Sequence, residues 1–127
     1  MRTVHLLIGL ATLAMFLATG LYMRANFPAL YNTNDAIRFL FRANHVYILF
    51  CSLIHIALGI YVVYRDTGWQ KKLQLAGSWM LFAAAPIFLA AFIYEPPQAS
   101  PMRPLTLIAA FLTLGGMTAH LIGGYKK

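Results

Sequence analysis

Four long stretches without a charged residue constrain this chain more than any other feature of its sequence. They cover residues 4–23, 46–64, 73–94 and 105–122. An α-helix of about 20 apolar residues crosses a bilayer core about 30 Å thick, so each stretch is of spanning or near-spanning length. The stretches are apolar on every face rather than alternating, which excludes transmembrane β-strands. The sequence therefore predicts an all-α, polytopic membrane protein, an antiparallel bundle of four transmembrane helices forming a single domain over residues 1–127.

The helix ends follow from capping and proline signals. We expect helices at about 4–23, 34–64, 73–94 and 105–122. The second starts early because Asn34 is a good N-cap and Asp35 suits the first turn. We expect Pro28 in an outer loop over 24–33, Pro86 at a kink in the third helix and Pro104 at the start of the fourth. Residues 1–20 also resemble a secretory signal peptide, but the apolar run is longer than a signal core, which favours a retained helix.

Positive charge predicts the orientation. With four spans both ends of the chain share one side, and that side is richer in Lys and Arg, which favours cytoplasmic termini in an inner membrane. The net charge of +7 then reflects topology and contact with anionic lipid rather than nucleic-acid binding. The two groups are Arg2, Arg65, Lys71, Lys72, Lys126 and Lys127 against Arg24, Arg38, Arg42 and Arg103.

Several classes of function lack support in the sequence. There is no serine elbow, phosphate loop or His-Glu-x-x-His motif, so no catalytic residue is expected and an enzyme is not predicted. The single cysteine, Cys51, excludes an intrachain disulfide, and no metal-ligand spacing is present. No acidic residue lies inside a span, which disfavours a proton pump.

Polar and small residues recur at helical spacing on one face of each span, and these faces should meet in the bundle because lipid disfavours them. A single compact bundle is the expected result. The faces are His5, Gly9, Thr12, Phe16 and Thr19; Asp35, Arg38, Arg42, His45, Ser52 and Gly59, with His55 at the margin; Gln74, Ser78 and Ala85; and Thr106, Ala110, Thr113, Met117, His120 and Gly124.

The histidines suggest a cofactor as one hypothesis. His5 and His120 lie near the inner ends of their helices and should be level, so they could face one another and hold a b-type haem, or a quinone nearby. Counting from a helix end at residue 64, His55 should lie roughly 10 Å above that level. His45 should lie at the outer boundary, so neither of these two has an expected partner. No cofactor is assigned on this basis.

A polar cluster at the outer end of the second helix supports the preferred hypothesis. Arg38 and Arg42 are one turn apart and could clamp a carboxylate or a lipid phosphate. We therefore expect a non-enzymatic membrane component that binds anionic lipid, a partner membrane subunit or a second copy of itself. The proposed contact residues are Asp35, Arg38, Arg42, Asn44 and His45.

A small-molecule transporter is a further alternative. Its hinge would be Pro86, and its intramembrane polar residues would be His55 and Ser52. This hypothesis depends on His55 lying near the middle of the bilayer.

Three short motifs carry a resemblance. They are RANHVYIL at 42–49, RTVHLL at 2–7 and YEP at 94–96. With them the chain resembles small four-helix bacterial inner-membrane proteins, a resemblance that implies the fold and the location but no activity. In overall plan it also resembles four-helix b-type cytochromes, which stack histidine pairs at two levels, whereas this chain offers a candidate pair at one level.

Overall fold

The computed structural model describes residues 1–66 and 68–125. In this part of the chain there is no strand, and all four α-helices are long and apolar enough to cross a membrane. The predicted all-α fold is confirmed, and the protein is a multi-pass membrane protein. Its elements are α1 (Arg2–Leu30), α2 (Asp35–Tyr61), α3 (Gly68–Tyr94), the short 3-10 helix η1 (Pro96–Gln98) and α4 (Pro104–Gly124).

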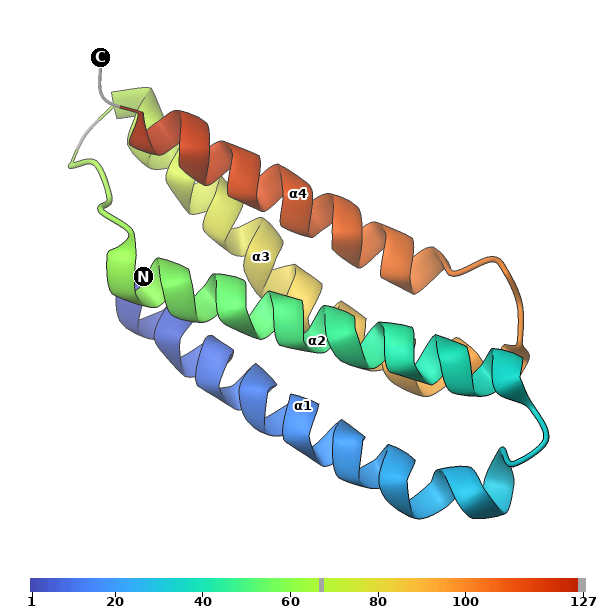
Figure 1. Ribbon diagram of the computed structural model, residues 1–127. Helices are drawn as coiled ribbons and strands as arrows, with labels where there is room; N and C mark the ends of the chain where they lie inside the picture. The colour runs from blue at the N-terminus through green and yellow to red at the C-terminus, as the bar shows by residue number, and fades with distance from the viewer. Residues whose placement is uncertain (67, 126–127) are drawn as a thin grey trace.

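The four helices form one bundle, in which consecutive helices run in opposite directions (Figure 1). α1 packs along α2 and α3 packs along α4, and the contact between α2 and α3 joins the two pairs. The start of α1, the end of α2, the start of α3 and the end of α4 lie at one end of the bundle. Large apolar side chains such as Leu21, Phe111 and Leu121 point outward, as lipid contact requires.

Three helix ends differ clearly from the prediction. α3 begins at Gly68 rather than at 73. α1 continues to Leu30, so the expected loop over 24–33 is wrong. Pro28 lies in the last turn of α1, where the missing N–H removes only one hydrogen bond near the helix end. α2 stops at Tyr61, and the chain then becomes extended from Val62. Gln74 satisfies this extended backbone, donating to Val63 O at 3.0 Å and accepting from Arg65 N at 2.9 Å.

The predicted caps are present at two other ends. The Asn34 side chain accepts a hydrogen bond from Ile37 N at 3.1 Å, and Asp35 follows in the first turn. Pro104 opens α4, where the lack of an N–H costs nothing because the first turn has no internal acceptor for it. Pro86 lies inside α3 as expected.

Small residues set the distance between the helices of each pair. A Cβ on Gly77 of α3 would come within 2.8 Å of the Gly116 carbonyl oxygen of α4, and one on Gly59 of α2 within 2.8 Å of the Leu6 nitrogen of α1. Such close backbone approach is typical of membrane helices, in which packing rather than water exclusion drives association. The predicted polar and small faces are largely buried in these contacts.

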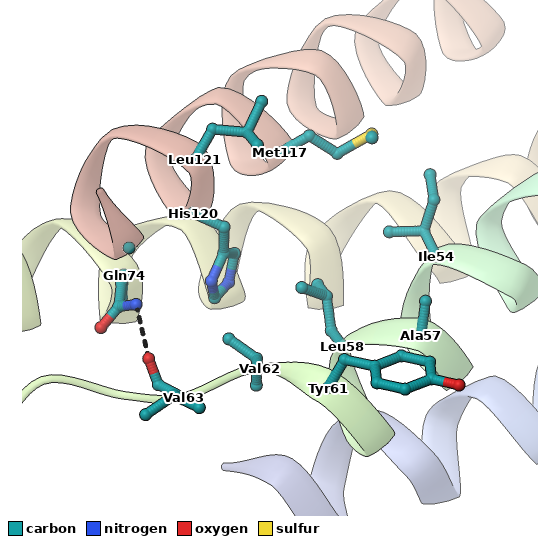
Figure 2. Close-up of a pocket in the computed structure, with 11 residues that line it drawn as sticks. Ile54, Ala57, Leu58, Tyr61, Val62, Val63, Gln74, Met117, His120 and Leu121 are labelled. Carbon is teal, nitrogen blue, oxygen red and sulfur yellow. Dashed lines mark hydrogen bonds between the residues drawn. The ribbon is translucent and has the colours of Figure 1, made fainter. Parts of the chain in front are cut away.

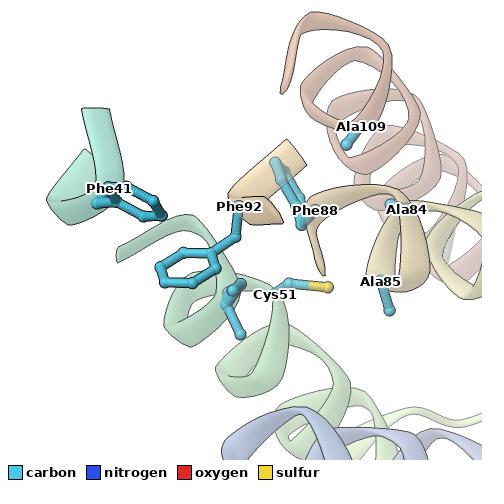
Figure 3. Close-up of a cluster of buried hydrophobic side chains, with 8 residues drawn as sticks. Phe41, Cys51, Ala84, Ala85, Phe88, Phe92 and Ala109 are labelled. Carbon is cyan, nitrogen blue, oxygen red and sulfur yellow. The ribbon is translucent and has the colours of Figure 1, made fainter. Parts of the chain in front are cut away.

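The half of the bundle near the α1–α2 and α3–α4 connections has an aromatic core (Figure 3). The Phe41 and Phe92 rings meet nearly edge to face with centroids 5.1 Å apart, an arrangement that the ring quadrupoles favour. The core comprises Phe41, Ile48, Cys51, Ala84, Ala85, Phe88, Phe92 and Ala109.

Candidate functional site

Three histidines from three helices meet at the end of the bundle where α1 begins and α4 ends. His5 of α1 and His55 of α2 approach with their Nδ1 atoms 2.9 Å apart. The Nε2 atoms of His5 and His120, the latter on α4, lie 3.0 and 3.1 Å from the Ser78 hydroxyl of α3. His5, His55 and Ser78 have no exposed surface, and His120 is 7% exposed. We call these four residues the histidine cluster.

The expected level of His55 is wrong. The Arg2 guanidinium hydrogen-bonds the carbonyls of Gly59 and Ile60, so the start of α1 is level with the end of α2. Because α2 ends at Tyr61 rather than at 64, His55 is closer to this end than expected and pairs with His5. The expectation that His55 has no partner is therefore wrong as well, since it also contacts the Leu81 carbonyl through Nε2 at 3.2 Å.

One further residue, Tyr64, belongs to the site. The Tyr64 hydroxyl lies 2.7 Å from the Ser78 hydroxyl. Burial raises the pKa of the Tyr64 phenol, while the contact with Ser78 lowers it, with a net rise. The hydroxyl is therefore protonated at neutral pH and can donate. Gln74 and Ser78, four residues apart on α3, were visible in the sequence as a polar face. Tyr64 was visible as an aromatic interface anchor, but nothing in the sequence indicated its contact with Ser78.

A cavity of about 540 Å³ lies beside this cluster, between the ends of α2 and α4. Figure 2 shows the His120 ring extending from α4 toward this space, and Gln74 beside Val63 at one end of the space. The His120 Nδ1 atom is buried and has no hydrogen-bond partner among the described residues. Apart from Tyr61, Gln74 and His120 the lining is apolar: Ile54, Ala57, Leu58, Val62, Val63, Met117, Leu121 and Gly124.

The predicted outer cluster is divided among three places. Asn44 does not contact Arg38 or Arg42 but belongs to a buried network. It accepts a hydrogen bond from the Arg103 guanidinium and donates one to Ala91 O at 2.8 Å. The same guanidinium lies 3.7 Å from the Glu95 carboxylate, which accepts from Thr106 N at 3.0 Å. This network ties α2, α3 and α4 together at the end of the bundle where α3 ends and α4 begins.

His45 leaves the cluster in another direction. It stacks on Phe16 of α1 with centroids 4.0 Å apart, and its Nδ1 lies 2.9 Å from the Thr19 hydroxyl. The expectation that His45 has no partner is wrong. Ser52 donates to Gly9 O at 2.8 Å and joins α2 to α1.

Arg38 and Arg42 do stay together on the surface. Their guanidinium carbons lie 5.8 and 6.0 Å from the centroid of the Phe27 ring of α1. Asp35 contacts Arg38 at 3.6 Å, but its side chain is almost fully exposed, so this pair is weak.

The present packing does not fit a haem between His5 and His120. Their rings are 5.7 Å apart, and the Ser78 hydroxyl lies within hydrogen-bond distance of both Nε2 atoms, where an iron would have to bind. The neighbouring cavity is lined by His120 but not by His5. Among the described residues no group of three His, Cys, Asp or Glu side chains is arranged to hold a metal ion.

The fold and the site define a small multi-pass membrane protein with a buried polar cluster beside an apolar cavity. Comparisons with protein-family models, with curated proteins and with solved structures return no match to this chain. The resemblance to four-helix inner-membrane proteins thus stays a prediction.

Proposed function

We propose that this integral membrane protein binds a lipid-soluble molecule with a polar head, of the quinone type, in the cavity between α2 and α4. The observation that carries the proposal is the lining of this cavity, which is apolar except for Tyr61, Gln74 and the His120 ring. Such a lining suits a ligand with an apolar body and a polar head.

The shape and lining of the cavity support this proposal. Its volume of about 540 Å³ lies within the range of small-molecule sites, which combine apolar walls with a few placed polar groups. Ala57 and Leu121 line it and are exposed on the outer surface of the bundle, where the chain meets lipid. A ligand can therefore enter sideways from the bilayer with its tail still in hydrocarbon.

Filling the cavity tests the proposal. Ala57→Phe places an aromatic ring at the cavity wall, and we expect it to weaken binding of a short-tail benzoquinone about tenfold or more, since the ring occupies the ligand's space. Binding would be titrated on the full-length protein in nanodiscs, alongside mass spectrometry of lipids that co-purify with it.

The matched control is Ala83→Phe on α3, where the side chain is exposed and does not line this cavity. It should bind as the unmodified protein does. If both variants bound the ligand with the affinity of the parent protein, the cavity would not be the binding site. A Soret band that is lost in His120→Ala would instead support the haem hypothesis.

A second candidate is an anionic headgroup site at Arg38, Arg42 and Phe27. Two guanidinium groups lie over one aromatic ring, and Arg38 Nε is buried without a partner among the described residues. A phosphate or carboxylate at this face would complete the hydrogen bonds of both arginines. An acidic loop of a partner subunit would fit the same face.

Charge reversal tests this second site. The double variant Arg38→Glu and Arg42→Glu should abolish the enrichment of anionic lipid, or of a partner, that co-purifies with the protein, because attraction becomes repulsion. Arg24→Glu, an exposed change on α1, is the control and should keep the enrichment. Unchanged co-purification in the double variant would argue against the site.

The topology remains part of the proposal. The bundle brings Arg2, Arg65, Lys71 and Lys72 to one end and Arg24, Arg38, Arg42 and Arg103 to the other. The excess of positive charge on the side of the termini therefore comes from Lys126 and Lys127 of the sequence, and with them the charge rule favours cytoplasmic termini in an inner membrane.

A further inference from the structure

The histidine cluster joins the two helix pairs at the end of the bundle where α1 begins and α4 ends. His5 of α1 lies 3.0 Å from the Ser78 hydroxyl of α3, and His55 of α2 lies 3.2 Å from the Leu81 carbonyl of α3. His120 of α4 contacts the same Ser78 hydroxyl at 3.1 Å. These contacts hold the α1–α2 pair against the α3–α4 pair.

The neutral cluster has one consistent arrangement of its protons. The Leu81 carbonyl can only accept, so His55 carries its proton on Nε2 and a lone pair on Nδ1. His5 Nδ1 lies 2.9 Å from that lone pair and donates to it, which leaves a lone pair on His5 Nε2. Ser78 donates to this atom, because donation to the Gln74 carbonyl, also 3.0 Å away, would leave His5 Nε2 buried without a donor.

The Ser78 hydroxyl then accepts from two other neighbours. The Tyr64 hydroxyl and His120 Nε2 lie 2.7 and 3.1 Å from it, and a hydroxyl accepts two hydrogen bonds. The proton of neutral His120 is therefore on Nε2. Its Nδ1, a buried atom without a partner among the described residues, has a lone pair. Each of the three imidazoles thus has one nitrogen at which another proton can bind.

A proton added at any of these nitrogens breaks a hydrogen bond or leaves a donor without an acceptor. On His55 Nδ1 it would face the N–H of His5 across 2.9 Å. On His5 Nε2 it would give the Ser78 hydroxyl three donors for two lone pairs. On His120 Nδ1 it would be a buried N–H without an acceptor among the described residues. The closed cluster therefore disfavours protonation.

No opposite charge among the described residues compensates an added proton. α1 contributes two positive charges, the amino group of the chain and the Arg2 guanidinium, one turn before its histidine. The connection after α2 contributes the neutral Tyr64 hydroxyl, α3 contributes the apolar Phe82 ring, and α4 has no other titratable residue. Asp66, the acidic residue at this end, is exposed. Protonation of the closed cluster would thus bury an unpaired charge.

The cavity between α2 and α4 has one wall in each helix pair. Ala57 of α2 lines one side and Leu121 of α4 lines the other. Toward the opposite end, Phe41 of α2 and Phe92 of α3 meet in the aromatic core, which contains no histidine. Separation of the two pairs at the histidine end would therefore widen the cavity, while the aromatic core holds the other half of the bundle together.

We infer that the histidine cluster is a pH-sensitive switch: in acid the two helix pairs separate at this end, the cavity widens and its ligand is released. This inference rests on the proposed function and adds its regulation. An imidazole in contact with water takes up a proton below about pH 6.5, whereas the closed cluster disfavours that proton. The open form therefore binds more protons. Each proton gained on opening shifts the balance toward the open form about tenfold per pH unit below that value.

Distances between spin labels test the switch without any ligand. Ile60→Cys on α2 and Ile122→Cys on α4, both exposed, place one label on each helix pair at the histidine end. Phe39→Cys and Leu107→Cys, also exposed, do the same at the opposite end. The full-length protein, with Cys51→Ala, is measured in nanodiscs from about pH 7.5 to about pH 5. We expect the first distance to lengthen, with an opening constant that rises at least tenfold per pH unit below about pH 6.5, and the second to stay constant.

Histidine variants assign the pH response to the cluster. His120→Gln cannot take up a proton, so the slope of the logarithm of the opening constant against pH should become shallower by about one unit. A merely structural role of His120 would shift the opening constant equally at every pH and leave the slope unchanged. His45→Gln removes the histidine outside the cluster and is the matched control, with the slope of the parent protein.

Ligand binding is measured over the same pH range. The probe is a short-tail benzoquinone, which carries no titratable group, so any pH dependence belongs to the protein. We expect it to bind about tenfold or more weakly at about pH 5 than at about pH 7.5, because the two walls of the cavity have moved apart.

The outcomes separate the inference from the proposed function. If the labels at the histidine end do not move, or if both label pairs move together as in unfolding, the switch is overturned whether or not the quinone binds. If the labels move but the affinity is equal at both pH values, the control of the cavity is overturned and the cavity remains a binding site. If the quinone does not bind at about pH 7.5, the proposed function and the release of its ligand fail, and the label distances still decide whether the cluster opens in acid. These measurements keep all four histidines, so misfolding of a histidine variant does not affect the decision.

Discussion

Replacing Ser78 with alanine is expected to lower the free energy of unfolding by about 2–4 kcal/mol, because three buried or half-buried groups lose their shared partner. His5 Nε2, His120 Nε2 and the Tyr64 hydroxyl all lie within 3.1 Å of this one oxygen. Each would be left facing a methyl group in an environment without water. Reversible unfolding in mixed micelles, followed by circular dichroism, would measure the change.

Thr118→Ala is the matched control for Ser78→Ala. The Thr118 hydroxyl donates only to Leu114 O in its own helix and is exposed, so its loss should change stability by less than about 0.5 kcal/mol. If both variants unfolded alike, the Ser78 hydroxyl would not be the centre of the polar cluster.

Gly77→Ala should destabilise the bundle by about 1–3 kcal/mol through steric overlap between α3 and α4. The new methyl carbon would lie 2.8 Å from the Gly116 carbonyl oxygen and 2.9 Å from the Ala119 Cβ. Neither atom belongs to a flexible side chain, so the helices themselves must separate. The same unfolding measurement gives the effect, and His120 binding to Ser78 should weaken with it.

Gly124→Ala provides the comparison on the same helix pair. A Cβ at that position would find only the Gln74 Nε2 atom, at an ordinary contact distance of 3.8 Å. Because alanine favours the helix over glycine, this variant should be as stable as the parent or slightly more stable. A loss equal to that of Gly77→Ala would contradict the role given to close packing.

Much of the architecture was predictable because membrane insertion imposes simple rules on composition. The four apolar stretches, the Asn34 cap and Pro104 at the first turn of α4 all follow from local chemistry. The polar faces were predictable for the same reason, since lipid disfavours them: His5, Ser78 and His120 are buried as expected.

The details of the site were less predictable because they depend on helix ends and on neighbours. The expected level of His55 was wrong since the sequence carries no strong stop signal between Tyr61 and Gly68, and the early end of α2 is stabilised by Gln74 from another helix. Asn44 was grouped with the arginines of its own helix, but Arg103, far away in the sequence, provides its partner.

The sequence by itself determined the environment and the number of crossings, because transfer of each long apolar stretch into hydrocarbon depends on composition and length alone. Only the tertiary structure decided which polar atoms meet, because the registers of α1 against α2 and of α3 against α4 bring His5, His55, Ser78 and His120 to one level. A hydrogen bond requires positions within a few tenths of an ångström, and packing of whole helices sets those positions.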